Sequence, residues 1–426
     1  MIALRPNRQR SLIALVQILG LSVWFSAAAV VPSLRSEWAF GSTASGWLTA
    51  SVQIGFAAGA VISTLLHLAD RITPQHLFAA GTACAAACTA AVALLAHDLG
   101  EAIALRFLTG AALAGVYPVG MKLMASWSES TDRGRWLGIL IGSLALGSAV
   151  PELINGFGAL PWRMVMVTAA ALSALAAIIA VAAIVPGPHL DSRPLTPNRR
   201  HVLAIFVERG FRLTNLGYLG HIWELYALWT WLPVFLIASR QGRGDAADTS
   251  TGIITFAAIG IAGAAGCLVG GWASDRFGRS PAAVTALLTS GACCIASPVF
   301  FAAPTPALVV FLLVWGAAVI ADSGVFSTSL SEIANKSLVG TALTTQTAVG
   351  FLLTVVTVQL VPLAADLLGW QYAFLLLAPG PVIGAVAMSA LHPFQHHQLE
   401  EESHDHQLYA PDAVRRSDSA ALTHRG

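Results

Sequence analysis

Charged side chains inside long apolar runs are the residues of this chain most able to do chemistry. A charge at the centre of a bilayer costs about 3 kcal/mol on insertion scales, so it is a functional candidate by default. Four charges lie well inside such runs: Arg106, Glu152, Glu224 and Asp322. The chemistry open to them is ion pairing, proton exchange and recognition of a charged solute.

Glu224 and Asp322 share one depth in the predicted membrane layer. Each lies ten or eleven residues from the nearer end of its apolar run, which at 1.5 Å per residue is about 15 Å and near mid-membrane. Two carboxylates at one depth are a candidate proton or cation site, which is the interpretation we favour. The alternative is that each carboxylate only accepts hydrogen bonds from neighbouring hydroxyls or amides.

The run that holds Glu224 also carries His221, Trp223 and Tyr226. His221 lies three residues before Glu224, on the same helical face, so this pair can share a proton at physiological pH. Trp223 and Tyr226 are also three residues apart, and their rings can stack on a planar or cationic solute. The alternative for these rings is the aromatic belt at the membrane interface.

Two further tryptophans, Trp229 and Trp231, lie just before Pro233 towards the end of the same run. Tryptophan is enriched where a membrane meets water. We therefore assign both residues to the interfacial belt rather than to a solute site.

Arg106 and Glu152 are predicted to form a buried ion pair. Each lies about five residues from the outer end of its run, so both are at a depth of about 8 Å. The interpretation we favour is a pair that braces two helices, because an unpaired buried charge is costly. The alternative is a proton relay.

The buried charged residues are positioned by the apolar runs in which they lie. The chain is 56% hydrophobic and only 11% charged, against about 25% charged in soluble domains. Twelve apolar runs are each long enough to cross a bilayer as a helix: 12–33, 44–66, 75–96, 100–125, 135–157, 162–185, 213–238, 250–273, 280–302, 305–329, 339–364 and 369–391. The composition therefore predicts an all-α membrane protein with twelve transmembrane helices.

The chain repeats itself with an offset of about 206 residues. Gly55 and Asp70-Arg71 have counterparts in Gly260 and Asp275-Arg276, and Gly110 has its counterpart in Gly316. A long repeat of apolar segments is typical of transporters built from two similar halves with the solute held between them. We therefore expect two pseudo-symmetric six-helix bundles around a central cavity.

The expected organisation has five parts. A cytoplasmic N-terminus (1–11) precedes the first bundle (12–185), a proline-rich basic linker (186–212) leads to the second bundle (213–391), and a tail (392–426) follows. The tail is rich in His and Glu, which permits weak metal binding, but its irregular spacing favours a disordered, solvated segment.

Lys and Arg give the expected orientation. Most of the 23 basic residues fall on the side of the N-terminus, and basic residues are retained on the cytoplasmic side. The first apolar run is longer than the core of a signal peptide, so we expect it to remain as a helix. The sequence predicts a multi-pass protein of the bacterial inner membrane with both termini cytoplasmic.

The strongest local motif is Gly270-Gly-Trp-Ala-Ser-Asp-Arg-Phe-Gly-Arg279. It resembles the Gly-x-x-x-Asp-Arg-x-Gly-Arg loop of the major facilitator superfamily. Asp70-Arg71 is its degenerate first copy, without the flanking glycines. The resemblance implies a cytoplasmic latch, which locks one state of the transporter and is formed by Asp70, Arg71, Asp275, Arg276 and Arg279.

Two other stretches are similar to the same family. Arg106-Phe-Leu-Thr-Gly110 resembles its buried-arginine signature, and the glycines before Pro151 resemble a pattern of antiporters, although Glu152 departs from that pattern. The chain is also broadly similar to nitrate, nitrite and cyanate carriers. However, the runs 44–66 and 250–273 lack Arg and Lys, which argues against a strong inorganic-anion site.

The function that follows is secondary active transport of a small solute by alternating access, coupled to protons. No Gly-x-x-x-x-Gly-Lys-Ser/Thr loop occurs, so ATP is not expected to drive this chain. We expect no enzyme activity, cofactor, metal site or nucleic-acid partner. The expected partners are the solute, protons and the lipid bilayer, with the chain as a monomer. The alternative is a non-transporting sensor or scaffold on the same fold.

Overall fold

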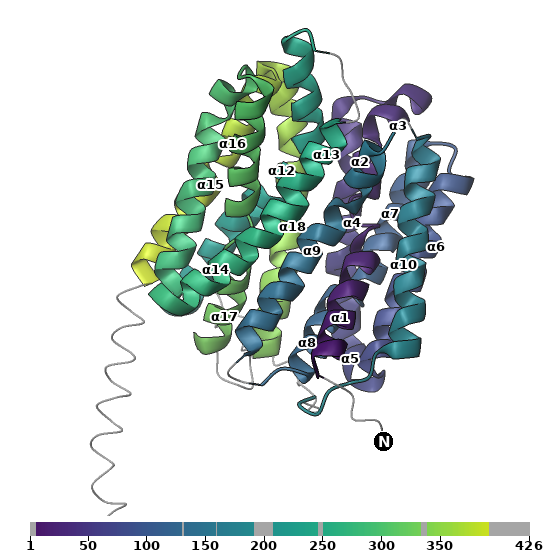
Figure 1. Ribbon diagram of the computed structural model, residues 1–426, viewed down its shortest axis with the longest axis vertical. Helices are drawn as coiled ribbons and strands as arrows, with labels where there is room; N and C mark the ends of the chain where they lie inside the picture. The colour runs from purple at the N-terminus through teal and green to yellow at the C-terminus, as the bar shows by residue number, and fades with distance from the viewer. Residues whose placement is uncertain are drawn as a thin grey trace, which may run out of the picture.

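The computed structural model describes residues 6–129, 132–158, 160–190, 208–245, 250–333 and 339–391. In this part of the chain every regular element is helical and no strand occurs. Eleven helices are long and apolar enough to cross a membrane. Figure 1 shows them as two groups side by side, which we call the N half (residues 6–190) and the C half (residues 208–391).

Six crossings make up the N half. Their helices are α1 (Pro6–Leu21), α2 (Ser26–Ala29) and α3 (Val31–Trp38) for the first crossing, α4 (Ser42–Leu65), α6 (Pro74–Leu95), α7 (Leu99–Leu113) with α8 (Tyr117–Ser126), α9 (Arg133–Gly156) and α10 (Trp162–Ala183). The short helix α5 (Leu68–Arg71) lies between α4 and α6.

The C half repeats this arrangement. Its helices are α12 (Arg209–Gly242), α13 (Ser250–Phe256) continued by the π-helix η1 (Ala257–Ala262) and α14 (Gly263–Phe277), α15 (Arg279–Phe301), α16 (Thr305–Ala318) with α17 (Ser323–Ile333), and α18 (Val339–Leu368). The last crossing spans Trp370–Leu391 and opens with α19 (Trp370–Ala373) and the 3₁₀-helix η2 (Phe374–Leu377).

Local sequence explains where several helices begin. The carboxylate of Asp98 accepts a hydrogen bond from the backbone N–H of Glu101 at 2.9 Å and so caps α7. Proline occupies the first turn of α6, α8 and α16, where its missing N–H costs nothing. Inside the apolar runs the backbone must satisfy its own polar groups, so the runs become helices.

Three crossings are interrupted near their middle. The first breaks at residues 22–25, the fourth at 114–116 and the tenth at 319–322. The first predicted span is therefore an interrupted helix rather than one continuous helix. A break frees backbone carbonyls, which need partners inside the protein.

Close glycine contacts show the repeat in three dimensions. A Cβ on Gly110 of α7 would lie 2.0 Å from the carbonyl oxygen of Val52 on α4, and a Cβ on Gly316 of α16 would lie 2.0 Å from that of Ala258 on η1. Both glycines and both partners are related by the same offset of 206 residues. Each half thus has the same close crossing, which only glycine permits.

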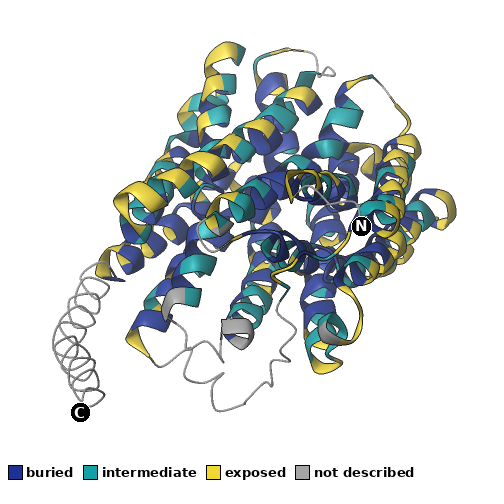
Figure 2. Cartoon of the chain, turned by 60° about the horizontal axis from the view of Figure 1, so that its bottom comes forward, coloured by how far each residue is buried: buried dark blue, intermediate teal, exposed yellow. Residues whose placement is uncertain are grey.

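The two halves meet through α4 with α18 and through α9 with α13 and α14. We call the side where α1 begins and the last crossing ends the terminal side, and the opposite side the far side. At the far side the Ser42 hydroxyl donates to the Asp366 carboxylate at 2.5 Å, and the backbones of Gly156 and Gly252 lie in contact. Figure 2 shows buried residues along this junction and exposed residues mainly on the outer faces.

The segment boundaries differ from the sequence expectation at a few ends. Helix α1 begins at Pro6 rather than after residue 11, and α12 begins at Arg209, inside the predicted linker. Most of the linker (191–207) and the tail (392–426) lie outside the described residues.

Candidate functional site

Arg106 is fully buried in the N half, where it fills the break of the first crossing. Its guanidinium donates to the carbonyl of Val23 at 2.8 Å, to the carbonyl of Trp24, and to the Ser26 hydroxyl at 3.3 Å. A third carbonyl, that of Leu48 on α4, lies at 3.5 Å. The break supplies carbonyl acceptors and Arg106 supplies the donors, so each accounts for the other.

The predicted ion pair between Arg106 and Glu152 is not formed in this structure. Arg106 bonds to backbone carbonyls, and no ion pair joins it to Glu152 in the described part of the chain. Glu152 lies instead where α9 crosses α13, with its backbone carbonyl against Gly252. Equal distance from the end of an apolar run suggested a pair, but the structure gives Arg106 backbone carbonyls as partners instead.

Glu224 is buried inside the C half, away from the junction. One carboxylate oxygen accepts from the Ser290 hydroxyl, and the other accepts from the Trp315 indole at 2.5 Å and the Cys294 thiol at 3.3 Å. These donors lie on α15 and α16. The arrangement matches the alternative in which the carboxylate only accepts hydrogen bonds from its neighbours.

His221 and Asp322 form a buried pair at the break of the tenth crossing. Nδ1 of His221 lies 2.8 Å from Oδ1 of Asp322, and the two side chains are 2% and 1% exposed. Oδ1 makes no aligned hydrogen bond. The other ring nitrogen, Nε2, lies 2.9 Å from the Ser323 hydroxyl.

This pair replaces the predicted partnership of His221 with Glu224. The imidazole lies between the carboxylate of Asp322 and the hydroxyl of Ser323. A Cβ placed on the neighbouring Gly324 would lie 3.4 Å from the side chain of Ile141, which belongs to the N half. The pair therefore lies close to the junction of the two halves.

Trp223 and Tyr226 separate in the structure. The Trp223 indole donates to the Leu376 carbonyl at 3.1 Å, so this ring belongs to the interior of the C half. Tyr226 points to the junction, where it stacks on Trp24 and Phe25 of the N half with ring centroids 6.0 Å apart in each pair.

Tyr226 is part of a group of six rings from both halves, which we call the central aromatic cluster. Its members are buried, at 0–4% exposure, and touch one another at centroid distances of 4.4–6.0 Å. They are Trp24, Phe25, Phe56, Tyr226, Trp229 and Phe351. The prediction that Trp229 belongs to an interfacial belt is wrong, and Trp231 is also buried, with its indole bonded to Val358.

Sequence reasoning missed the N-half members of this cluster. Trp24 lies in the middle of an apolar run, where an interfacial belt cannot explain a tryptophan. That position was the available signal. The partners Phe56 and Phe351, with ring centroids 4.4 Å apart, carry no comparable signal, because phenylalanine is ordinary in an apolar helix.

The latch motif is described best in its second copy. Arg279 contacts Asp275 at 2.8 Å and the Ser274 hydroxyl at 2.9 Å across the turn at Gly278, whose φ is 95°. Arg276 is exposed. Of the first copy, Arg71 is exposed at the end of α5, and the side chain of Asp70 lies outside the described residues. The latch role stays a prediction.

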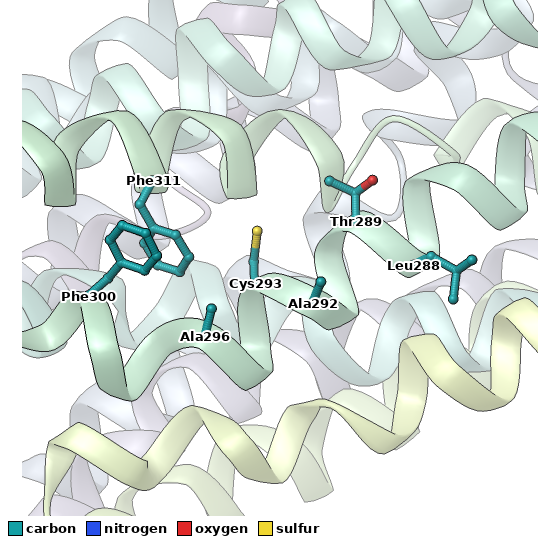
Figure 3. A pocket seen from close by; sticks show the side chains of 7 residues that line it. All are labelled: Leu288, Thr289, Ala292, Cys293, Ala296, Phe300 and Phe311. Atoms are coloured by element: carbon teal, nitrogen blue, oxygen red, sulfur yellow. The ribbon is translucent and has the colours of Figure 1, made fainter.

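A groove lies on the outer surface of the C half, between α15 and α16 (Figure 3). Its volume is about 480 Å³, and its lining, which includes Phe300, Phe311 and Cys293, is mainly apolar. The groove is on the surface that faces lipid and not at the junction. Among the described residues, no group of three His, Cys, Asp or Glu could hold a metal ion.

The sequence matches the Major Facilitator Superfamily over residues 13–358 and 216–417. The chain belongs to this family. Its twelve crossings in two bundles are the fold of the family, and the family resemblance of the latch motif is thereby confirmed. The eleven long apolar helices are those of a multi-pass membrane protein.

Two relatives with assigned functions are similar to the chain. The niacin transporter NiaP of Acinetobacter baylyi is 27% identical over 349 residues, covering 71% of this chain and 74% of that protein. The gallate transporter of Pseudomonas putida is 27% identical over 305 residues, covering 63% of this chain. The match spans 65% of the gallate transporter, just under two thirds of its length.

Two solved structures share the fold. The xylose transporter XylE from E. coli, in a partially occluded inward open conformation, is 13% identical with a TM-score of 0.69, covering 90% of this chain and 97% of that one. The nucleoside transporter NupG is 15% identical with a TM-score of 0.69, covering 91% and 100%. Relatives and neighbours together support solute transport as the function.

Proposed function

We propose that the chain is a secondary transporter that moves a small planar aromatic acid by alternating access, coupled to protons. The observation that carries the proposal is the central aromatic cluster, in which rings from both halves meet at mid-membrane. Aromatic faces suit a planar ring. Niacin and gallate, named for two relatives, are both aromatic carboxylic acids.

Proton coupling is assigned to His221 and Asp322. A buried histidine and carboxylate at mid-membrane can exchange one proton with modest changes of surroundings. The pair lies at a helix break next to the junction, so a movement of the two halves would change its exposure. Glu224 is not assigned this role, because its three donors lie within the C half.

The proposed orientation follows from the basic residues. We place both termini in the cytoplasm and the chain in the bacterial inner membrane as a monomer. With that orientation, the far side is the outside. The halves are then in contact outside, through Ser42 with Asp366 and Gly156 with Gly252.

The test is uptake by the full-length protein in liposomes. Labelled nicotinate is offered with the exterior more acidic than the interior, and we expect accumulation that a protonophore collapses. Uptake that ignores the pH gradient would remove the coupling. No nicotinate, benzoate or gallate flux under any gradient would favour a non-transporting sensor or scaffold.

A further inference from the structure

Two indole N–H groups of the central aromatic cluster have no hydrogen-bond partner. Nε1 of Trp24 and Nε1 of Trp229 are buried and unpaired, although other buried indoles donate, such as those of Trp231 and Trp315. Buried polar groups in proteins normally have a hydrogen-bond partner, so two donors without one in the same cluster require an explanation.

Other unpaired buried polar atoms lie elsewhere in the described chain, but these two indoles contact the same ring, that of Tyr226. Trp24 stacks on Tyr226 at 6.0 Å and on Phe351 at 5.7 Å, and Trp229 meets the edge of Tyr226 at 5.7 Å. Gln53 lies one helical turn from Phe56 on α4 and is fully buried, with both amide atoms unpaired. One region therefore combines ring faces from both halves with free hydrogen-bonding groups.

One buried cation lies next to this region. Arg106 donates to the backbone carbonyls of Val23 and Trp24, and no ion pair joins it to a carboxylate among the described residues. An indole N–H can only donate, so it needs an acceptor. Positive potential, donor groups and ring faces together suit an aromatic anion and not an aromatic cation.

We propose that the N–H groups of Trp24 and Trp229 bind the carboxylate of a planar aromatic acid, whose ring stacks within the central aromatic cluster. Gln53, with a donor and an acceptor, contacts a substituent on that ring. This inference rests on the proposed function and adds the residues that recognise the solute. The rings are packed together in this conformation, so the cluster must open to admit the solute.

The two unpaired N–H groups affect the relative free energies of the closed and open states. Unpaired buried donors destabilise the closed, empty state. A carboxylate that accepts from them removes this cost, so the solute stabilises the closed state more than the open one. Binding and closure are then coupled through the same two N–H groups.

The test compares Trp24→Phe and Trp229→Phe with the matched control Trp231→Phe. All three keep an aromatic ring and lose an N–H, but only the control loses a hydrogen bond that the structure contains, to Val358. Affinities of the purified full-length protein for nicotinate and for neutral nicotinamide are measured by calorimetry, together with thermal stability.

We expect each of the two cluster variants to lose nicotinate affinity about tenfold, or about 1.4 kcal/mol, with a smaller loss for nicotinamide. Their melting temperatures should be unchanged or higher. The control should show the reverse: a lower melting temperature and unchanged nicotinate affinity. Either cluster variant alone is sufficient if the other does not fold.

Two failures are distinguishable. If wild-type protein binds nicotinate and the folded cluster variants bind it equally well, the assignment of the N–H groups is wrong and the proposed function stands. If wild-type protein binds no aromatic acid but is folded, the proposed function fails and this inference fails with it.

Discussion

The fourth and tenth crossings break at equivalent places, at 114–116 in the N half and at 319–322 in the C half. With the repeat offset of 206 residues, Val116 corresponds to Asp322 and Arg106 corresponds to Leu312. The backbone is therefore repeated where the charges are not. Arg106 of the fourth crossing bonds to the break of the first crossing, which α12 does not repeat, whereas Asp322 lies in the break of the tenth crossing itself.

The two halves also satisfy their buried charges differently. Arg106 bonds to backbone carbonyls of the first crossing, whereas Glu224 and Asp322 are held by side chains within the C half. Backbone acceptors cannot titrate, while an imidazole beside a carboxylate can. The two halves therefore differ in what holds their buried charges: backbone carbonyls for Arg106, and side chains for Glu224 and Asp322.

The largest expected effect comes from Arg106→Leu, which replaces Arg106 by the residue at the equivalent position of the C half, Leu312. The change leaves the carbonyls of Val23 and Trp24 without donors in a buried site. We expect a loss of about 1–3 kcal/mol for each carbonyl left unpaired, measured as thermal stability in detergent. A variant as stable as wild type would show that the break does not depend on Arg106.

A double-mutant cycle with Glu152→Gln sharpens this result. Because Arg106 and Glu152 do not pair in the structure, their effects should add within about 0.5 kcal/mol. A clear coupling energy would indicate that Arg106 and Glu152 form the predicted ion pair in another state of the transporter.

The next effect tests the C half through Asp322→Asn. The amide cannot carry a proton, so His221 loses its acidic partner while the size of the side chain is kept. We expect proton-driven accumulation of nicotinate to fall about tenfold or more, while exchange of nicotinate for nicotinate across the membrane continues. Both activities are measured in the same liposomes.

Ser323→Ala is the matched control for that substitution. It removes the hydroxyl at 2.9 Å from Nε2 of His221 but leaves the carboxylate in place. Its proton-driven accumulation should stay close to that of wild type. Equal loss in both variants would indicate that the imidazole environment as a whole, and not Asp322, is needed.

Glu224→Gln should have a smaller effect, and on stability rather than coupling. The amide has an NH2 group in place of one acceptor oxygen, so it cannot accept from both Ser290 and Trp315, which lie inside the C half. We expect a loss of about 1.5–3 kcal/mol with an unchanged dependence of uptake on the pH gradient. Uptake that no longer responds to the pH gradient would show that Glu224 takes part in proton coupling.

The sequence predicted the features that depend on spacing alone. The apolar runs and the offset of 206 residues follow from period and position, and the structure has both. The packing of Gly110 on Val52 and of Gly316 on Ala258 is the clearest case.

The neighbouring helix that each buried side chain faces could not be predicted from spacing. Depth placed Arg106 level with Glu152, and Glu224 level with Asp322, but depth does not say which neighbour a side chain faces. His221 could pair with Glu224 along its own helix, yet it pairs with Asp322 on another. The break of the first crossing was also hidden, because its partner Arg106 lies about 80 residues away.

The smallest effect concerns an exposed ion pair and contrasts with all of these buried charges. Glu37 of the N half accepts from Arg163 at 2.7 and 3.1 Å and from the Trp162 indole at 2.6 Å. The bonds from Arg163, and then that from Trp162, lower the pKa of Glu37 below its usual value. A lowered pKa means that the ionised form stabilises the fold above the ordinary carboxyl pKa and that this contribution is lost as the pH falls through the lowered value.

Glu37→Gln should therefore cost at most about 1 kcal/mol at pH 7, because both partners of the ion pair are partly exposed and solvent screens them. The difference in melting temperature between the variant and wild type should shrink as the pH falls below about 4, where wild-type Glu37 becomes protonated. High salt should reduce the difference as well, since exposed pairs are screened. A difference that is large, or that stays constant from pH 7 to pH 3, would mean that the glutamate acts through packing against Trp162 and not through its charge.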